Sequence, residues 1–285
     1  MAQLIKLKDY VSRYEWNAFR YPSRYIRLKQ DNWDGLYDIW RNSAHKDNVD
    51  KQSRPILMDS ELLPESEIEL RQYFLDMLFP LQLKWATSTV TDVSFIDKKH
   101  HYDDTLKYFL QRFPDIYLMM YYPIFNINKT TIDGEIILIS PIGIEIIYLM
   151  EDSPQATILA GDDRTWMIER GITESKVISP LIALKRTEHI IKRILNTEKI
   201  DFAINKLVIS RTNNIVFSSE PYNTKIIGKF QFEKWFTEKR QLRSSLKGLQ
   251  LKAVEALLKH CLTTSIKRPE WEEGVNANTS DSEEK

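Results

Sequence analysis

The stretch EIILISPIGIEIIYLM, residues 135–150, constrains most strongly what this chain can fold into. β-Branched and other apolar residues fill both of its halves, and the Ser-Pro-Ile-Gly segment 140–143 interrupts them. Such runs separated by Pro and Gly predict a β-hairpin. The hairpin ends on Tyr148 and Met150, where a chain of this pattern can carry charge. What the hairpin holds is therefore the first question about function.

Composition narrows the class of protein. The 285 residues suffice for one large domain or two modest ones, and 40 basic residues balance 40 acidic ones, so any attraction to nucleic acid must be local. Cys261 is the only cysteine, which excludes a disulfide-stapled fold and fits a reducing compartment. Residues 1–10 lack the apolar run of a signal peptide. We expect a soluble, cytoplasmic protein with no membrane partner.

The first third of the chain, residues 1–95, has the spacing of aromatic-rich amphipathic helices broken at Pro22. A polar loop is expected at 47–54, and a helix at 65–79 should end before Pro80. Aromatic residues of this kind more often form a core or a subunit contact than a platform on which bases stack.

The middle of the chain, residues 96–222, alternates helical and strand patterns and predicts an α/β fold with a mixed sheet. We expect the strands at 116–122, 136–149 and 206–217 to share one sheet, covered by two helices. The other predicted elements are a helix at 103–112, a strand near 166–169 and a helix at 180–195 that has Pro180 in its first turn.

The last part of the chain separates its charges. Residues 225–268 contain eleven Lys and Arg against three acids, and residues 270–285 contain six acids against one Lys. Residues 223–268 are expected to form basic helices at 229–239 and 242–261, with Gly248 unfavourable inside the second. The tail 269–285 should be disordered. It either folds back and competes for the basic surface or only aids solubility.

The order of features over residues 100–218 resembles the nuclease-related domain (NERD). A helix and a strand precede Glu135, Gly143 makes the turn, Tyr148 and Met150 end the hairpin, and Pro180 opens a helix after a strand with a Trp. That domain is identified as a member of the PD-(D/E)XK nuclease fold. The resemblance implies a restriction-endonuclease-like core between helical N- and C-terminal regions.

In such nucleases, carboxylates hold Mg²⁺ and a Lys two residues after a Glu stabilises the attacking group. The resemblance implies an Asp at the start of the hairpin and a Glu-x-Lys at its end. These positions fall on Glu135, Tyr148 and Met150. The acid is kept as Glu, but the Glu-Lys pair is lost. We therefore predict a vestigial site without a metal cofactor.

Two further acids complete the vestigial catalytic set of Glu135, Asp103 and Asp133. The family's helix Glu falls on Asp103, although Asp104 competes for this alignment, and its helix Gln falls near Ala183.

Mg²⁺ would be a cofactor only if displaced acids substitute for the missing Glu. Glu151 and Asp152 are the candidates, because a bulge could turn Glu151 inward. A cation would then have to reach in from Lys185 or Arg186 on the following helix.

Other motifs carry less chemistry. Residues 98–104, KKHHYDD, contain zinc-ligand types, but adjacent His side chains point apart, and a helix entry capped by Asp103 or Asp104 is favoured. Neither a nucleophile elbow nor a Gly-rich phosphate loop occurs.

The basic residues Lys239, Arg240, Arg243 and Lys247 are the predicted nucleic-acid contacts. The alternative is that such side chains solvate the outside of a core helix and pair with acids near 61–69.

Three functions remain open. The first is a degenerate nuclease-fold module that binds nucleic acid or a protein partner without cutting. The second is an active Mg²⁺-dependent DNA nuclease that uses displaced carboxylates. The third is a structural interaction protein assembled through its aromatic N-terminal helices. Metal binding separates the second from the others, and salt-dependent nucleic-acid binding separates the first from the third. The sequence does not define an oligomeric state.

Overall fold

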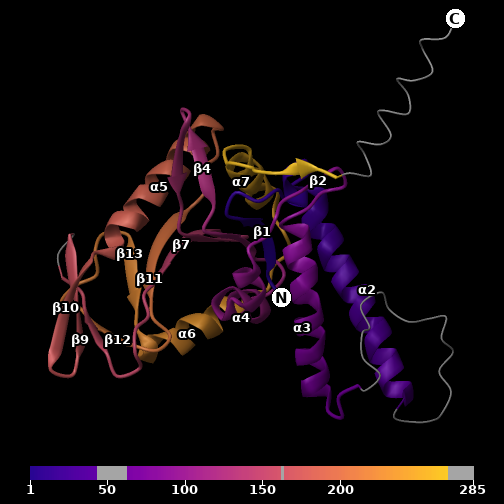
Figure 1. The fold of residues 1–285 in the computed structure, drawn as a ribbon, viewed down its shortest axis with the longest axis horizontal. Helices are drawn as coiled ribbons and strands as arrows, with labels where there is room; N and C mark the ends of the chain where they lie inside the picture. Colours follow the sequence, from indigo (N-terminus) through magenta and orange to yellow (C-terminus); the bar gives the residue numbers. More distant parts are fainter. Residues whose placement is uncertain (44–62, 162–163, 269–285) are drawn as a thin grey trace, which may run out of the picture.

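The computed structural model describes residues 1–43, 63–161 and 164–268, and its centre is a six-stranded mixed sheet (Figure 1). The strand order is β1-β3-β6-β7-β11-β13. β3, β6 and β7 are antiparallel neighbours, whereas β1 is parallel to β3 and β11 is parallel to both β7 and β13. The α/β class with a mixed central sheet is therefore confirmed. The strands are β1 Gln3–Leu7, β3 Leu118–Tyr121, β6 Ile136–Ser140, β7 Gly143–Leu149, β11 Ile204–Ile209 and β13 Thr224–Ile227.

The predicted hairpin is formed by β6 and β7. Ser140 pairs with Gly143, and the Ser140 hydroxyl donates to the Gly143 carbonyl at 3.0 Å. Gly143 has φ +156°, and an added Cβ would lie 3.0 Å from the Ala203 carbonyl oxygen. Any other residue here would have to adopt a backbone conformation that is rare for L-amino acids, and its Cβ would be too close to Ala203.

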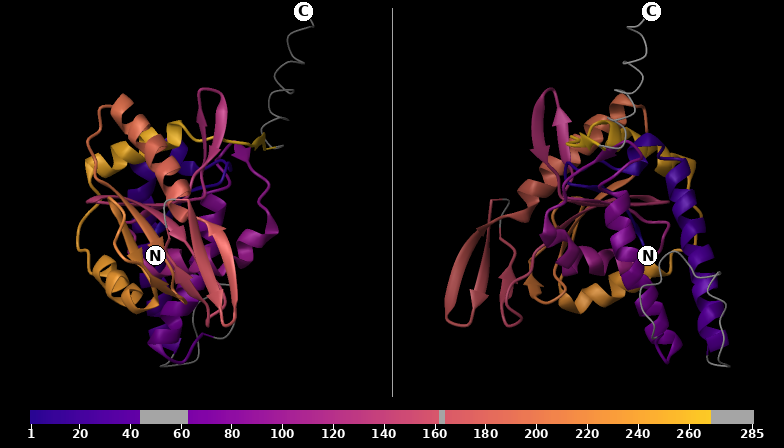
Figure 2. Two further views of the ribbon diagram at one scale, coloured as in Figure 1. Left: turned by 90° about the vertical axis from the view of Figure 1, so that its left-hand side faces the viewer. Right: turned by 45° about the vertical axis from the view of Figure 1, so that its right-hand side comes forward.

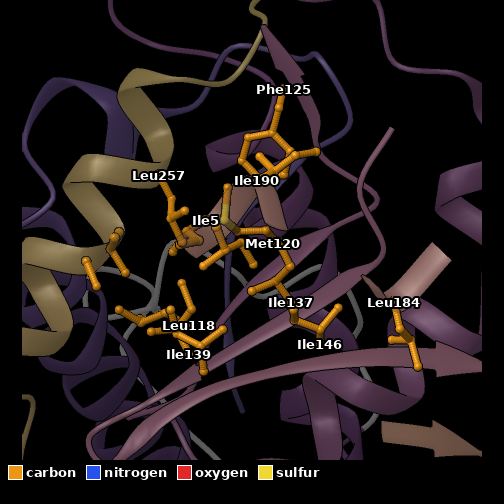
Figure 3. Close-up of a cluster of buried hydrophobic side chains, with 14 of the residues drawn as sticks. Ile5, Leu118, Met120, Phe125, Ile137, Ile139, Ile146, Leu184, Ile190 and Leu257 are labelled. Carbon is orange, nitrogen blue, oxygen red and sulfur yellow. The ribbon is translucent and has the colours of Figure 1, made fainter. Parts of the chain in front are cut away.

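Helices cover both faces of the sheet, so its central strands are buried on both sides. α3 packs on β1 and α4, and α6 packs on β13. On the other face α5 packs on β7 and β11, and α7 packs on β6. Figure 3 shows this second core, where Ile137 and Ile146 of the hairpin meet Leu184 of α5. The longer helices are α2 Arg20–Ser43, α3 Glu67–Trp85, α4 Asp104–Arg112, α5 Pro180–Thr197, α6 Lys229–Arg240 and α7 Gly248–Lys259, and α1 Arg13–Trp16 is a single turn.

A second, four-stranded sheet stands at one side of the main sheet, with the order β10-β9-β8-β12 (Figures 1 and 2). Its last strand corrects a prediction. Residues 214–217 were expected in the main sheet, but β12 is parallel to β8 instead. The chain turns between β11 and β12 at Asn213, whose buried amide donates to the carbonyls of Ser153 and Ala156. The strands are β8 Thr157–Leu159, β9 Thr165–Arg170, β10 Thr173–Ile178 and β12 Asn214–Val216.

Two small sheets complete the described fold. β4 (Ile124–Ile127) and β5 (Thr130–Asp133) form a hairpin between β3 and β6 in the sequence. It projects beside α5 (Figure 2), and Arg193 of α5 donates to the Asn128 side chain at its tip. β2 (Asp92–Val93) pairs with β14 (Ile266–Lys267).

The N-terminal region differs from its all-helical prediction, because β1 is a buried edge strand of the main sheet. α3 also continues through Pro80 to Trp85 instead of ending before the Pro. Proline inside a helix costs about 3 kcal/mol. Burial of Leu83 and Trp85 beyond Pro80 offsets that cost.

The C-terminal region is less helical than predicted. Residues 242–247 have no regular structure, and α7 begins at Gly248, so the expected helix 242–261 was wrong over its first third. A Gly at the start of a helix avoids the cost of one in its interior. Leu242 and Leu246 still pack against the two cores. The predictions for 47–54 and for the tail 269–285 lie outside the described residues. None of the described helices is long and apolar enough to cross a membrane.

We predict that Gln82 is required for the docking of β1. Its buried amide accepts from the Leu4 N–H at 3.0 Å and donates to the Ala2 carbonyl at 2.7 Å. Gln82→Ala leaves both backbone groups unpaired and should reduce the free energy of unfolding by about 2–4 kcal/mol. The exposed Gln72→Ala is the control, expected within about 0.5 kcal/mol of the parent. Urea unfolding measures both, and equal losses would contradict this role of Gln82.

Candidate functional site

Glu135 and Tyr148 lie opposite each other at the open end of the β6–β7 hairpin. Ile136 pairs with Ile147, so the next cross-strand neighbours are Glu135 and Tyr148. Both follow the alternation of Ile137 and Ile146, whose side chains face α5. Glu135 is only 9% exposed. The register therefore places the predicted acid beside the position where the resemblance implies a second one.

Met150 lies two residues beyond Tyr148 and is buried in the core on the same side of the sheet. Its N–H donates to the Ile209 carbonyl at 2.8 Å, which continues the pairing with β11. A thioether in this place offers no charge to a phosphate or a water.

Asp103 approaches from the start of α4. It is the N-cap of that helix, and its carboxylate accepts from the Leu106 N–H at 2.9 Å. The Tyr121 hydroxyl donates to both of its oxygens, at 3.0 and 3.2 Å. The predicted helix entry at 98–104 is thus confirmed with Asp103 as the cap. Of the two histidines, His100 is buried and His101 is exposed.

Tyr122 lies within electrostatic range of both Glu135 and Asp103. Burial, together with the nearby charges of Glu135 and Asp103, raises its pKa to about 12. Its φ of +47° is a left-handed conformation that is rare for a bulky residue and costs about 1–3 kcal/mol. Burial and Glu135 likewise raise the pKa of Tyr148. The site thus contains two carboxylates and two neutral phenols.

A guanidinium partly balances Glu135. Arg186 of α5 lies 3.7 Å from its carboxylate, and the Glu135 N–H donates to the Thr187 hydroxyl. Burial raises the pKa of Glu135, Arg186 opposes the rise, and Asp133 adds to it. Lys185 and Arg186 were the two helix cations predicted to reach the site, and Arg186 lies beside Glu135.

Asp133 ends β5 and is exposed, so it reaches Glu135 by electrostatics and not by a shared buried pocket. Gly134 between them is tightly packed. A Cβ there would lie 2.9 Å from the Phe125 ring and 3.1 Å from the Pro123 carbonyl oxygen. The chain therefore needs glycine to pass from the β4–β5 hairpin into β6.

The two displaced acids are held by arginines. Arg211 binds Glu151 through both nitrogens of its fork, at 2.6 and 2.7 Å. Arg170 binds Asp152 in the same manner, at 2.7 and 2.6 Å, and holds the pKa of that carboxyl well below its usual range. Bidentate pairs of this kind are strong and directional. A metal would have to break them to recruit either acid.

Among the described residues, no group of three or more His, Cys, Asp or Glu side chains is arranged to hold a metal ion. Glu135 lies beside Arg186 and within electrostatic range of Asp133, whereas the Asp103 carboxylate accepts from the Tyr121 hydroxyl and the Leu106 N–H. These acids do not form a compact set of oxygen ligands.

The sequence interpretation missed a basic surface on α5. The helix buries Leu184 and Ile191 and exposes a row of cations on its outer side. We call this row the α5 basic face; it consists of Lys185, Arg186, His189, Lys192 and Arg193. Spacing of three and four residues places these side chains on one side of a helix. That spacing is visible in the sequence, but its position beside Glu135 depends on the fold.

The predicted C-terminal basic residues are divided in the structure. Lys239 pairs with Glu145 of β7, not with acids near 61–69, and Arg240 lies over the Phe236 ring at 5.5 Å. Arg243 and Lys247 are exposed in the segment between α6 and α7. They therefore do not continue a helical row, contrary to prediction.

Comparisons with known proteins add little to this geometry. No protein-family model matches the chain, and no solved structure matches it. Over 52 residues the chain is 38% identical to an RNA 2′,3′-cyclic phosphodiesterase of Geobacillus stearothermophilus. The match covers 18% of this chain and 17% of that protein. It is a local similarity.

The burial of Glu135 predicts a pH-dependent stability difference. Its folded-state pKa is raised, so ionisation opposes folding as pH rises above the ordinary value of about 4.3. Glu135→Gln should therefore raise the melting temperature at pH 7, and the gain should vanish below about pH 4. Thermal unfolding from pH 3 to 8 measures it.

Glu151→Gln is the matched control, because it removes the same charge from a carboxylate that an arginine holds. We expect it to destabilise the fold at pH 7 by about 1–3 kcal/mol. A loss of stability in Glu135→Gln at pH 7 would contradict the account of the site.

Proposed function

We propose that this protein is a nuclease-fold module that binds nucleic acid and does not cut it. The observation that carries the proposal is the cross-strand position of Glu135 and Tyr148 beside the α5 basic face. α4, β3, β6, β7, α5 and β11 follow one another in the order on which the resemblance to the nuclease-related domain rests. The inserted β8–β10 strands carry the expected Trp, Trp166.

The absence of cutting follows from the residue types at the hairpin end. Metal-dependent hydrolysis needs carboxylates around Mg²⁺ and a cation for the attacking group. Tyr148 and Met150 supply neither, and Arg186 stands beside the remaining acid. A phenol and a guanidinium can still donate to a phosphate. The site would then bind the backbone it no longer cleaves.

The α5 basic face supports nucleic acid as the ligand class. It lies next to Glu135, and a hollow of about 560 Å³ is lined by His189, Lys192 and Arg193. Cations in one row suit a phosphate backbone, and contacts of this type tolerate any base sequence. The curated relative's name refers to RNA, so RNA belongs among the ligands to test.

Two other functions remain as alternatives. An active nuclease would have to free Glu151 or Asp152 from its arginine. A structural interaction protein would use the aromatic N-terminal helices. Two of their rings, Tyr14 and Tyr25, are buried against Trp85 and are not available for assembly.

Binding should depend on the α5 basic face. We expect Lys185→Glu with Arg193→Glu to weaken binding of duplex and single-stranded DNA and RNA at low salt. The log–log salt slope should flatten by about 0.9 per lost contact on duplex DNA. Fluorescence anisotropy at several salt concentrations measures both quantities.

Arg243→Glu with Lys247→Glu makes the same change in net charge and is the matched control. Loss of binding in this control alone would shift the interface to the C-terminal basic residues. No binding by the parent protein, even at low ionic strength, would favour a protein partner.

Cleavage should remain at background with Mg²⁺ or Mn²⁺ on plasmid, linear and single-stranded DNA and on RNA. Tyr148→Glu with Met150→Lys should create Mn²⁺ binding that calorimetry can detect, provided that circular dichroism shows an intact fold. Metal-dependent cleavage by the parent protein that Glu135→Ala abolishes would instead establish the active-nuclease alternative.

A further inference from the structure

A second basic surface lies at the start of α2, away from the residues of the hairpin site. Arg20, Arg24 and Arg27 are exposed and spaced by four and three residues, which places them on one side of the helix. The row extends about 10 Å along the helix axis. At about 3.4 Å of rise per phosphate, this length matches about three phosphates of a stacked strand.

These three arginines have no ion-pair partner within the described residues, unlike many other cations of this fold. Arg170 and Arg211 bind carboxylates, and Lys6 is buried against Glu15. The acid nearest to the row in sequence is Asp31, which lines the same hollow but forms no ion pair there. The charge of the row is therefore available to a ligand.

The position of Arg20, at the start of the row, is unfavourable for the isolated helix. α2 has 24 residues and no acidic residue in its first turn, and its first residue is Arg20. Cations near a helix N-terminus are opposed by the helix dipole. The Asn17 side chain caps the helix by accepting from the N–H groups of Phe19 and Arg20. A bound anion would interact favourably with both the arginines and the dipole.

The surface beside the row is hollowed. A recess of about 590 Å³ is lined by all three arginines together with Ser23 and Asn32. Hydroxyl and amide groups donate readily to phosphate or sugar oxygens. A recess along a cationic row fits a flexible strand better than it fits a flat bilayer.

Two exposed aromatic residues, Trp16 and Phe19, precede the row in the sequence. Trp16 is 54% exposed and Phe19 is 41% exposed, whereas Tyr14 and Tyr25 in the same region are fully buried. Exposed rings beside cations provide stacking surfaces for unpaired bases. α1 ends at Trp16, and α2 starts four residues later at Arg20, so both rings lie at the junction of the two helices.

We propose that the α1–α2 surface, consisting of Trp16, Phe19, Arg20, Arg24 and Arg27, binds single-stranded nucleic acid. The arginines contact consecutive phosphates, since their planar forks match phosphate oxygens. Trp16 and Phe19 stack on bases at one end of the strand. This inference shares its ligand class with the proposed function, but it stands on residues that the hairpin site does not use.

The test uses the full chain and a labelled ten-nucleotide oligothymidine, oligouridine and a duplex of the same length. Arg20→Ala, Arg24→Ala and Arg27→Ala together should weaken single-strand binding by at least tenfold. They should also flatten the salt slope by about 2, since each contact contributes about 0.7 on single strands. Trp16→Ala should weaken binding about 5- to 100-fold and leave the slope unchanged.

Lys176→Ala, Lys225→Ala and Lys234→Ala remove the same charge from exposed positions elsewhere and serve as the control. Equal weakening by this control would reduce the effect to net charge and overturn the proposal. The proposal also fails if the arginine variant binds oligonucleotides normally, if Trp16→Ala changes only self-association, or if anionic phosphatidylserine vesicles compete with the strand through the same residues.

The two surfaces can fail independently. If the α5 charge reversal abolishes binding and the arginine variant does not alter it, the α1–α2 inference is wrong and the proposed function stands. If only the arginine variant loses the single strand, the nucleic-acid role belongs to α2 and the hairpin site loses its proposed ligand. Retained binding in both variants contradicts both.

Discussion

The pairing of β6 with β7 through the turn at Pro141 and Ile142 is the constraint on which the rest of the structure depends. A shift by one residue would turn every buried side chain of the hairpin to the opposite face. Both faces are covered by helices, so such a shift would disrupt two cores at once. The close approach of Gly143 to Ala203 requires glycine at this end of the turn. The register in turn fixes that Glu135 meets Tyr148 at the open end, where α5 contributes Arg186.

The acids at the open end of the hairpin form ion pairs with arginines and do not gather around a common point. Glu151 and Asp152 each lie in a two-nitrogen fork, and Glu135 has a looser contact at 3.7 Å. A metal site needs several carboxylates whose mutual repulsion is relieved only by the ion. Here arginines relieve it from within the chain. A metal would have to displace these arginines before it could recruit the acids.

Local signals predicted the elements that are encoded locally. The hairpin followed from its β-branched halves, and the start of α4 followed from a capping Asp103. β1 was missed because Lys6 interrupts a short run. This Lys is tolerated in the interior because it donates to the Tyr10 carbonyl and pairs with Glu15 and Thr263, and a linear reading does not bring Thr263 to it. The contact of Arg186 with Glu135 likewise depends on the fold and could not be predicted. The spacing of the cations on α5, by contrast, is visible in the sequence and is enough to predict a basic helix face.

A net charge of zero conceals how the charges are distributed. Acids near the hairpin are neutralised at short range, while the outer side of α5 and the first turns of α2 keep exposed cations. Screening at physiological salt limits the reach of an exposed charge to about 8 Å, so acids elsewhere do not cancel these surfaces for a ligand in contact with them. A charged ligand that contacts either surface would therefore be held by short-range interactions that weaken as salt increases. Overall composition therefore argues against long-range attraction of nucleic acid, yet it leaves room for two short-range contacts on a nearly neutral fold.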